Sequence, residues 1–263
     1  MRWTILGFVA LCSAASALPA ADFDLSTRFT QEVFKNDKGE SLKYRFLKPA
    51  SLAPSAGGAS KFPLVVFLHG AGERGDDNAK QLIHGVTKFA TDEYLKKYPC
   101  FVIAPQCPTG KRWVEVDWSL DSHRMPETVS ESLRLTMELI ASLEKSFPID
   151  SNRLYVTGLS MGGYGSWDAI QRFPERFAAA VPVCGGGDTQ QAKKIAKIPV
   201  WAFHGAKDTA VKPQRSRDMI AAMKEAGGEP KYTEYPEVGH NSWVSAYNTP
   251  ELYEWMFAQK LKK

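Results

Sequence analysis

Ser160 lies in the part of the chain whose residue types most clearly predict chemistry. It stands between Gly158 and Gly162, after a short apolar run that predicts a buried strand and before residues 164–170, which predict a helix. At such a strand-to-helix turn the serine hydroxyl projects away from the backbone, and the glycines let strand and helix approach closely. We therefore expect Ser160 to act as a nucleophile, with the Met161 N–H directed at the position where an oxyanion forms.

A nucleophilic serine needs a general base, and two histidines follow Ser160, namely His204 and His240. His240 comes after a predicted strand, in a loop that contains glycine. Asp208 stands in the turn after the apolar run 199–205, a predicted strand whose carboxyl end meets the serine at one edge of the sheet. An aspartate there can also serve as a turn or helix cap. The order predicts a triad of Ser160, Asp208 and His240, and His204 is interpreted as a strand-end residue that shapes the loop of the acid.

A second oxyanion donor is predicted upstream. Residues 62–68 predict a central strand, and His69, Gly70 and Ala71 open the glycine-rich loop that follows it. A loop of this kind at the end of a strand can supply a backbone N–H, here that of Ala71. Glycine-rich loops also bind phosphates, but the Gly-Lys-Ser/Thr that a nucleotide site requires is absent.

Three longer strings narrow the interpretation: LHGAGERGDDN at 68–78, PIDSNR at 148–153 and GLSMGG at 158–163. With these, the chain from about Arg45 onward resembles the α/β-hydrolase superfamily. Within it, the strings look like the bacterial esterases described as predicted peptidases or phospholipase/carboxylesterases, relatives of feruloyl and acetylxylan esterases. The resemblance implies the same triad and ester hydrolysis, and this chemistry requires no metal or organic cofactor.

The function favoured by these residues is that of a serine carboxylesterase, acting on a small-molecule or polysaccharide-linked ester with a short or aromatic acyl group. The alternative enzyme is a serine peptidase of the prolyl-oligopeptidase type. Those peptidases usually carry an additional gating domain, for which the chain has no fitting segment. A catalytically inactive binding protein is a third alternative, and the complete triad argues against it.

The elements that position these residues alternate between strand and helix. A mostly parallel central sheet of about eight strands, flanked by helices on both faces, is therefore predicted. Residues 185–197 leave room for only one short helix before the strand of the acid, so we expect no large lid. The predicted strands are 27–34, 42–47, 62–68, 101–106, 154–156, 178–183, 199–205 and 231–235, and the predicted helices lie near 77–88, 127–147, 164–170, 189–196, 213–226 and 251–260.

Three tryptophans are candidate substrate-binding residues. Trp113 and Trp118 lie in the long loop after the strand 101–106, and Trp243 follows His240 by three residues. Aromatic side chains at the catalytic edge can form a wall for an acyl or sugar group. Alternatively, they pack the loops onto the domain, and the sequence leaves both interpretations open.

The N-terminus predicts export. A positive charge at Arg2 and an apolar stretch from Thr4 to Ala17 are typical of a signal peptide. The small residues allow cleavage after Ala17 or after Ala20, and we favour Ala20. Residues 1–20 are thus the predicted signal peptide and 21–263 the single catalytic domain, secreted or periplasmic. A formal net charge of +4 without a long basic tract gives no support to binding of nucleic acid or a membrane surface.

Cys100, Cys107 and Cys184 remain after the predicted cleavage, and an odd number leaves at least one thiol unpaired. The first two bracket a predicted strand and are too far apart to bond. Cys107 and Cys184 both follow strands at the catalytic edge, so the sequence allows either a disulfide between them or two packed thiols. Cysteine–histidine spacing typical of a metal site is absent.

Overall fold

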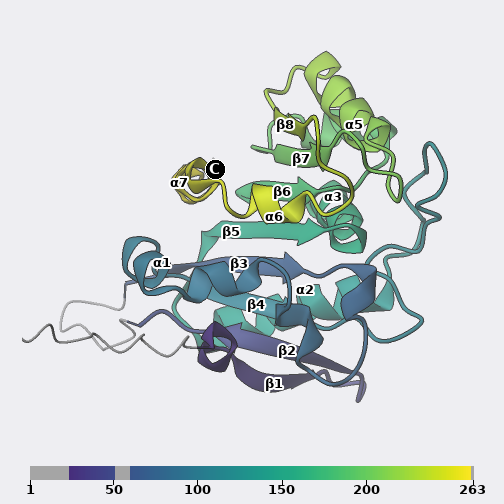
Figure 1. Ribbon diagram of the computed structural model, residues 1–263. Helices are drawn as coiled ribbons and strands as arrows, with labels where there is room; N and C mark the ends of the chain where they lie inside the picture. The colour runs from purple at the N-terminus through teal and green to yellow at the C-terminus, as the bar shows by residue number, and fades with distance from the viewer. Residues whose placement is uncertain (1–23, 51–59, 262–263) are drawn as a thin grey trace, which may run out of the picture.

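The computed structural model describes residues 24–50 and 60–261, which form one sheet with helices on both faces (Figure 1). The predicted signal peptide at residues 1–20 lies outside the described residues. Among the described helices, none combines the length and apolar composition that crossing a bilayer requires.

The sheet has eight strands in the order β1-β2-β4-β3-β5-β6-β7-β8. The first two form an antiparallel hairpin, β2 also pairs antiparallel with β4, and every other neighbouring pair is parallel. Parallel neighbours require crossover connections, which explains why helices separate most strands. The strands are β1 (Thr30–Lys35), β2 (Ser41–Leu47), β3 (Phe62–Leu68), β4 (Phe101–Pro105), β5 (Ile149–Leu159), β6 (Ala179–Val183), β7 (Trp201–Gly205) and β8 (Lys231–Tyr235).

The α-helices are α1 (Asp92–Lys97), α2 (Glu131–Ser146), α3 (Met161–Arg172), α4 (Ala192–Ile195), α5 (Gln214–Glu225), α6 (Trp243–Ala246) and α7 (Pro250–Ala258). They make two apolar layers, as β3 illustrates. Leu64 and Val66 pack in the cluster that contains side chains of α2, α3 and α5. Val65 and Phe67 pack in the other cluster, with side chains of α1 and α7. The alternation along β3 follows from the two-residue period of a strand.

The predicted fold class is confirmed. The sheet is mostly parallel, it has eight strands, and helices flank it. In the described part of the chain, only the short 3₁₀ turn η5 (Thr189–Gln191) and α4 lie between β6 and β7, so no large lid is inserted there.

The α-helix predicted near residues 77–88 is wrong. Two short 3₁₀ turns lie in this region, η3 (Lys80–Leu82) and η4 (Val86–Ala90). Gly85 between them has a φ of +78°, and a Cβ at this position would lie 2.3 Å from the ring of Tyr247. The chain therefore turns tightly against that ring, in a conformation that interrupts a regular helix.

The three cysteines in the described residues are buried free thiols. Cys107 Sγ lies 3.3 Å from Ser132 Oγ on α2, so its side chain is occupied within the layer of helices. Of the two arrangements that the sequence allowed, the structure therefore has packed thiols, and the disulfide between Cys107 and Cys184 is not formed.

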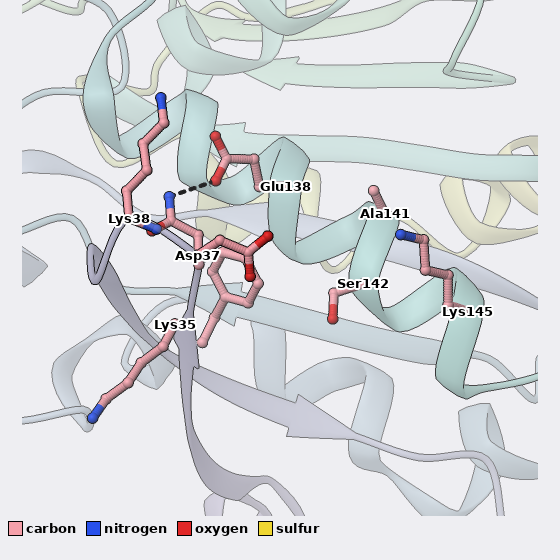
Figure 2. A pocket seen from close by; sticks show the side chains of 9 residues that line it. Lys35, Asp37, Lys38, Glu138, Ala141, Ser142 and Lys145 are labelled. Atoms are coloured by element: carbon pink, nitrogen blue, oxygen red, sulfur yellow. Dashed lines mark hydrogen bonds between the residues drawn. The ribbon is translucent and has the colours of Figure 1, made fainter.

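The hairpin turn between β1 and β2 is anchored to α2 at the outer edge of the sheet (Figure 2). Asn36 Nδ2 donates to Glu138 Oε2 at 2.8 Å, and Arg134 pairs with both Glu40 and Glu138 at 2.6 and 2.7 Å. A cavity of about 440 Å³ lies between the turn and the helix. None of the residues that line it is a predicted site residue, so the cavity belongs to the attachment of the hairpin.

The start of α2 is fixed by Ser130. Its Oγ accepts from Leu133 N at 3.2 Å and donates to Trp113 O at 2.6 Å, so one side chain caps the helix and fastens the preceding loop. This cap explains why the helix begins at Glu131, later than the predicted start at residue 127.

Ser130→Ala should lower the free energy of unfolding by about 1–2 kcal/mol, because it removes the cap of α2. Urea unfolding followed by tryptophan fluorescence measures the loss. Ser142→Ala, at an exposed position of the same helix, is the matched control and should change the free energy by less than about 0.5 kcal/mol. Equal losses in the two variants would contradict the assignment of the cap.

Candidate active site

Ser160 sits at a sharp turn between β5 and α3. Its φ of 55° and ψ of −117° lie where residues other than glycine are rarely found, at a typical cost of about 1–3 kcal/mol. The turn is held by Ser160 N, which donates to Val183 O of β6 at 2.9 Å. It is also constrained by Gly162, where a Cβ would lie 1.8 Å from Leu68 O at the end of β3. Glycine is therefore required at this position by the close approach of α3 to the sheet.

The structure brings Ser160, His240 and Asp208 into one chain of hydrogen bonds. His240 Nε2 lies 2.9 Å from Ser160 Oγ, and His240 Nδ1 lies 2.7 Å from Asp208 Oδ2. The imidazole is 29% exposed, whereas the carboxylate has no exposed surface. With Nδ1–H donating to the carboxylate, Nε2 is free to accept the proton of the serine hydroxyl.

Asp208 is held as a carboxylate by the groups around it. Its Oδ1 accepts from the backbone N–H groups of Ala210 and Val211, both at 2.9 Å. Burial raises the pKa of Asp208, but hydrogen bonds from His204, His240 and Val211 outweigh burial and hold the pKa well below its ordinary value. The side chain is therefore ionised at neutral pH.

Three other acids that the sequence places in the same half of the chain have different partners. Asp168 pairs with Arg172 on α3 at 2.6 Å. Asp188 accepts a hydrogen bond at 3.0 Å from the backbone N–H of Met125, which lies in the long loop after β4. Glu237 forms an ion pair on the surface with a lysine. Of these carboxylates and Asp208, only Asp208 has a hydrogen bond to His240 in the described residues.

The two predicted oxyanion donors begin adjacent helical segments. Ala71 opens the 3₁₀ turn η2 (Ala71–Glu73) after β3, and Met161 opens α3 after β5. Since β3 and β5 are parallel neighbours with Leu68 opposite Gly158, both segments leave the same edge of the sheet. The first N–H groups of a helix have no partner within it, so these two N–H groups are suited to bind an anionic oxygen.

The loop that carries Ala71 is fixed by His69, a role that the sequence analysis missed. His69 Nε2 accepts from Cys107 N at 2.9 Å, and Nδ1 therefore carries the proton and donates to Gly70 O at 2.6 Å. Burial lowers the pKa of His69 to about 4, which keeps the ring neutral. Trp113 Nε1 donates to His69 O at 2.9 Å. The pair His69-Gly70 at the end of the predicted strand is the sequence feature that could have indicated this role.

For Trp113, the structure supports the second of the two interpretations that the sequence left open, packing of the loop rather than a wall for the substrate. Its indole is fully buried against α3 and its N–H is used by His69 O, so the residue packs the loop onto the domain. Trp118 is partly buried, with the Arg112 guanidinium 4.3 Å from the centre of its ring. Trp243 stands edge to face with His240, with the ring centres 5.3 Å apart. Of the three tryptophans, Trp243 is thus in direct contact with the hydrogen-bonded chain.

One group in the described residues has donor atoms close enough to hold a metal ion: Cys184, Asp208 and His240. Burial raises the pKa of the Cys184 thiol to about 12, so this sulfur is protonated at neutral pH. Two members of this group, Asp208 and His240, are already joined to each other by a hydrogen bond of 2.7 Å, so both are assigned to the hydrogen-bonded chain with Ser160.

The chain is similar to a known protein family and to known esterases. The sequence matches the dienelactone hydrolase family over residues 80–249. It is 26% identical over 189 residues to a bifunctional acetylxylan esterase/xylanase of Neocallimastix patriciarum, covering 71% of this chain and 24% of that protein. It is 23% identical over 192 residues to the Arabidopsis thaliana carboxylesterase SOBER1, covering 67% and 82%. A solved thermostable esterase matches with a TM-score of 0.82 and 40% identity, covering 90% of this chain and 64% of that one.

The family match extends over more than half of the 263 residues. The chain spans about a quarter of the length of the acetylxylan esterase/xylanase, so it is similar to one part of that larger protein. The resemblance to serine esterases of the α/β-hydrolase superfamily is confirmed at the level of the family. The protein belongs to the dienelactone hydrolase family.

Proposed function

We propose that the protein is a serine carboxylesterase with Ser160 as nucleophile, His240 as general base and Asp208 as the acid that orients the base. The observation that carries the proposal is the unbroken chain of hydrogen bonds from Ser160 Oγ through the imidazole to the buried carboxylate. It lies at a strained turn that exposes the serine, directly before the N-terminus of α3. Similarity to esterases supports the same conclusion.

The geometry suits acyl transfer. His240 Nε2 takes the proton as Ser160 Oγ attacks the ester carbonyl, and Asp208 stabilises the imidazolium that forms. The N–H groups of Ala71 and Met161 bind the oxyanion, and each such donor typically contributes about 3–4 kcal/mol to transition-state stabilisation. The imidazolium then protonates the leaving alcohol, and a water molecule, activated by the same histidine, hydrolyses the acyl-enzyme.

The proposed substrates are esters with a short or aromatic acyl group, small or linked to a plant polysaccharide. Three findings support this choice. The site has no inserted lid between β6 and β7 in the described residues, so a long chain can extend past it. Trp243 lies beside His240 and offers an aromatic surface for a sugar or feruloyl ring. The acetylxylan esterase/xylanase to which the chain is similar acts, by its name, on such a polymer.

Ser160→Ala should lower kcat for p-nitrophenyl acetate by about 10⁴- to 10⁶-fold while the protein stays folded, because it removes the nucleophile. Steady-state kinetics and circular dichroism measure the two quantities. Ser151→Ala, on the same strand but at its opposite end, is the matched control and should keep wild-type kcat. Retention of more than a tenth of the activity by Ser160→Ala would exclude this nucleophile.

A panel of substrates separates the proposed esterase from a peptidase. We expect p-nitrophenyl acetate, methyl ferulate and acetylated xylan to be hydrolysed, and esters with acyl chains of about ten carbons or more to react much more slowly, because interfacial lipases usually need a large apolar surface. A peptide amide without a blocking group should be inert. Faster cleavage of the amide than of every ester would favour the peptidase instead.

Trp243→Ala and Trp118→Ala should raise KM for acetylated xylan more than KM for p-nitrophenyl acetate. The loss of an aromatic contact of about 0.5–1.5 kcal/mol corresponds to a change of about 2- to 12-fold. Trp255→Ala, on α7 and packed against Trp201, is the control and should leave the ratio of the two KM values unchanged. Equal ratios in all three variants would show that the first two tryptophans do not bind the polymer.

We also propose that the protein is exported through the predicted signal peptide. The support is the sequence pattern at residues 1–20, with one positive charge before a short apolar stretch. Intact-mass spectrometry of the protein from the periplasm or medium should give a chain that begins at Ala21. Recovery of the full-length chain from the cytoplasm alone would refute export.

A further inference from the structure

His204 lies near the end of β7, fully buried behind the acid of the proposed triad. Its Nδ1 is 2.8 Å from Ser216 Oγ on α5. Its Nε2 is 3.0 Å from Val211 O and 3.2 Å from Asp208 Oδ2. The mechanism described above uses none of these contacts, yet they connect a second imidazole to the carboxylate that orients His240.

The partners of Nδ1 determine whether this nitrogen carries a proton. Ser216 Oγ also lies 3.0 Å from Gly185 O, and a carbonyl oxygen can only accept. The Ser216 hydroxyl has one hydrogen, and it donates this hydrogen to Gly185 O. Its oxygen is then left to accept from His204, so Nδ1 must be a donor.

The partners of Nε2 lead to the same conclusion for the other side of the ring. Val211 O can only accept, and the Asp208 carboxylate already accepts from two backbone N–H groups and from His240, so it too acts as an acceptor toward Nε2. An unprotonated Nε2 facing two acceptors would repel both of them. Nε2 must therefore also carry a proton, and a ring with protons on both nitrogens is an imidazolium.

We propose that His204 is a buried imidazolium that acts as a positioning residue: it fixes the Asp208 carboxylate toward His240 and offsets part of its negative charge. The effect on catalysis rests on the proposed function, whereas the protonation state does not. A buried carboxylate without a cation is costly, and a positively charged ring with its Nε2 3.2 Å from Oδ2 reduces that cost.

The hydrogen bonds of Asp208 agree with this pairing. Its Oδ1 accepts two backbone N–H groups, and its Oδ2 faces His240 Nδ1 and His204 Nε2. Three hydrogen bonds and the contact with His204 occupy both oxygens of the carboxylate. The carboxylate is thus unable to rotate without breaking a bond, which keeps one oxygen directed at His240.

The charged groups around His204 come from several elements. Glu234 on β8 stands opposite His204 in the strand register, and the Arg217 guanidinium holds the pKa of Glu234 at about 2, with a smaller contribution from His204. Arg215 on α5 directs its guanidinium away, to Leu120 O at 3.0 Å. The ring therefore lies among two carboxylates and two arginines, with the His240 imidazole beyond Asp208.

The protonation state can be measured in the wild-type chain without any substrate. In a sample labelled with ¹⁵N-histidine, an imidazolium gives two similar ring-nitrogen shifts, whereas a neutral ring gives one protonated and one bare nitrogen that are well separated. We expect the His204 pair to show the imidazolium pattern. His204→Gln identifies the resonances, and a neutral pattern for His204 at neutral pH would overturn the proposal.

The effect on catalysis is tested by the pH profile of kcat/KM for p-nitrophenyl acetate. His204→Gln keeps an N–H donor for Asp208 but removes the positive charge, so the more negative carboxylate should stabilise protonated His240. We expect the acidic limb to move to higher pH by about one unit. In the control His123→Gln the limb should stay in place, because burial lowers the pKa of His123 to about 4 and the variant removes no charge.

The two measurements distinguish the failure of this inference from failure of the proposed function. If the wild-type protein hydrolyses no ester, the esterase proposal fails while the ¹⁵N pattern still decides the charge of His204. If ester hydrolysis is present and His204→Gln leaves the acidic limb where it is, His204 exerts no charge effect on His240 and the inference is wrong.

Discussion

The arrangement of the site depends on one close contact, between the first turn of α3 and the end of β3. A Cβ at Gly162 would lie 1.8 Å from Leu68 O, so any larger residue forces the helix away from the sheet. The same approach sets Ser160 at a positive φ and places the N–H of Met161 beside the loop of Ala71. The proposed nucleophile and the proposed oxyanion donor Met161 thus have their positions fixed by one backbone contact, and His69 fixes the loop of Ala71 beside them.

The second constraint is the burial of the Asp208 carboxylate, whose negative charge is stabilised by groups from three parts of the chain. Asp208 has no exposed side-chain surface, which opposes its ionisation. Backbone N–H groups of its own turn, His240 from the loop after β8 and His204 from β7 all point at it. The carboxylate that contacts His240 is consequently held by several neighbours, and the imidazole itself remains accessible from solvent.

Most of the sheet could be predicted from the sequence because the central strands contain short apolar runs before turns and β2 alternates between polar and apolar residues. The positions of Ser160, Asp208 and His240 followed from the same pattern, since carboxyl ends of parallel strands share an edge. The region 77–88 could not be predicted, because the contact of Gly85 with Tyr247 joins residues that are distant in the sequence. The burial of Trp113 could not be predicted either, because it depends on contacts with His69 and α3, which are distant from it in the sequence.

The most direct test of the central claim is to trap the acyl-enzyme. The protein is mixed with p-nitrophenyl acetate, quenched in acid within the first turnovers, and digested for mass spectrometry. The account predicts one acetyl group on the peptide that contains Ser160, and none in Ser160→Ala. Rapid ester hydrolysis with the acetyl group on another residue, or with wild-type turnover in Ser160→Ala, would contradict it.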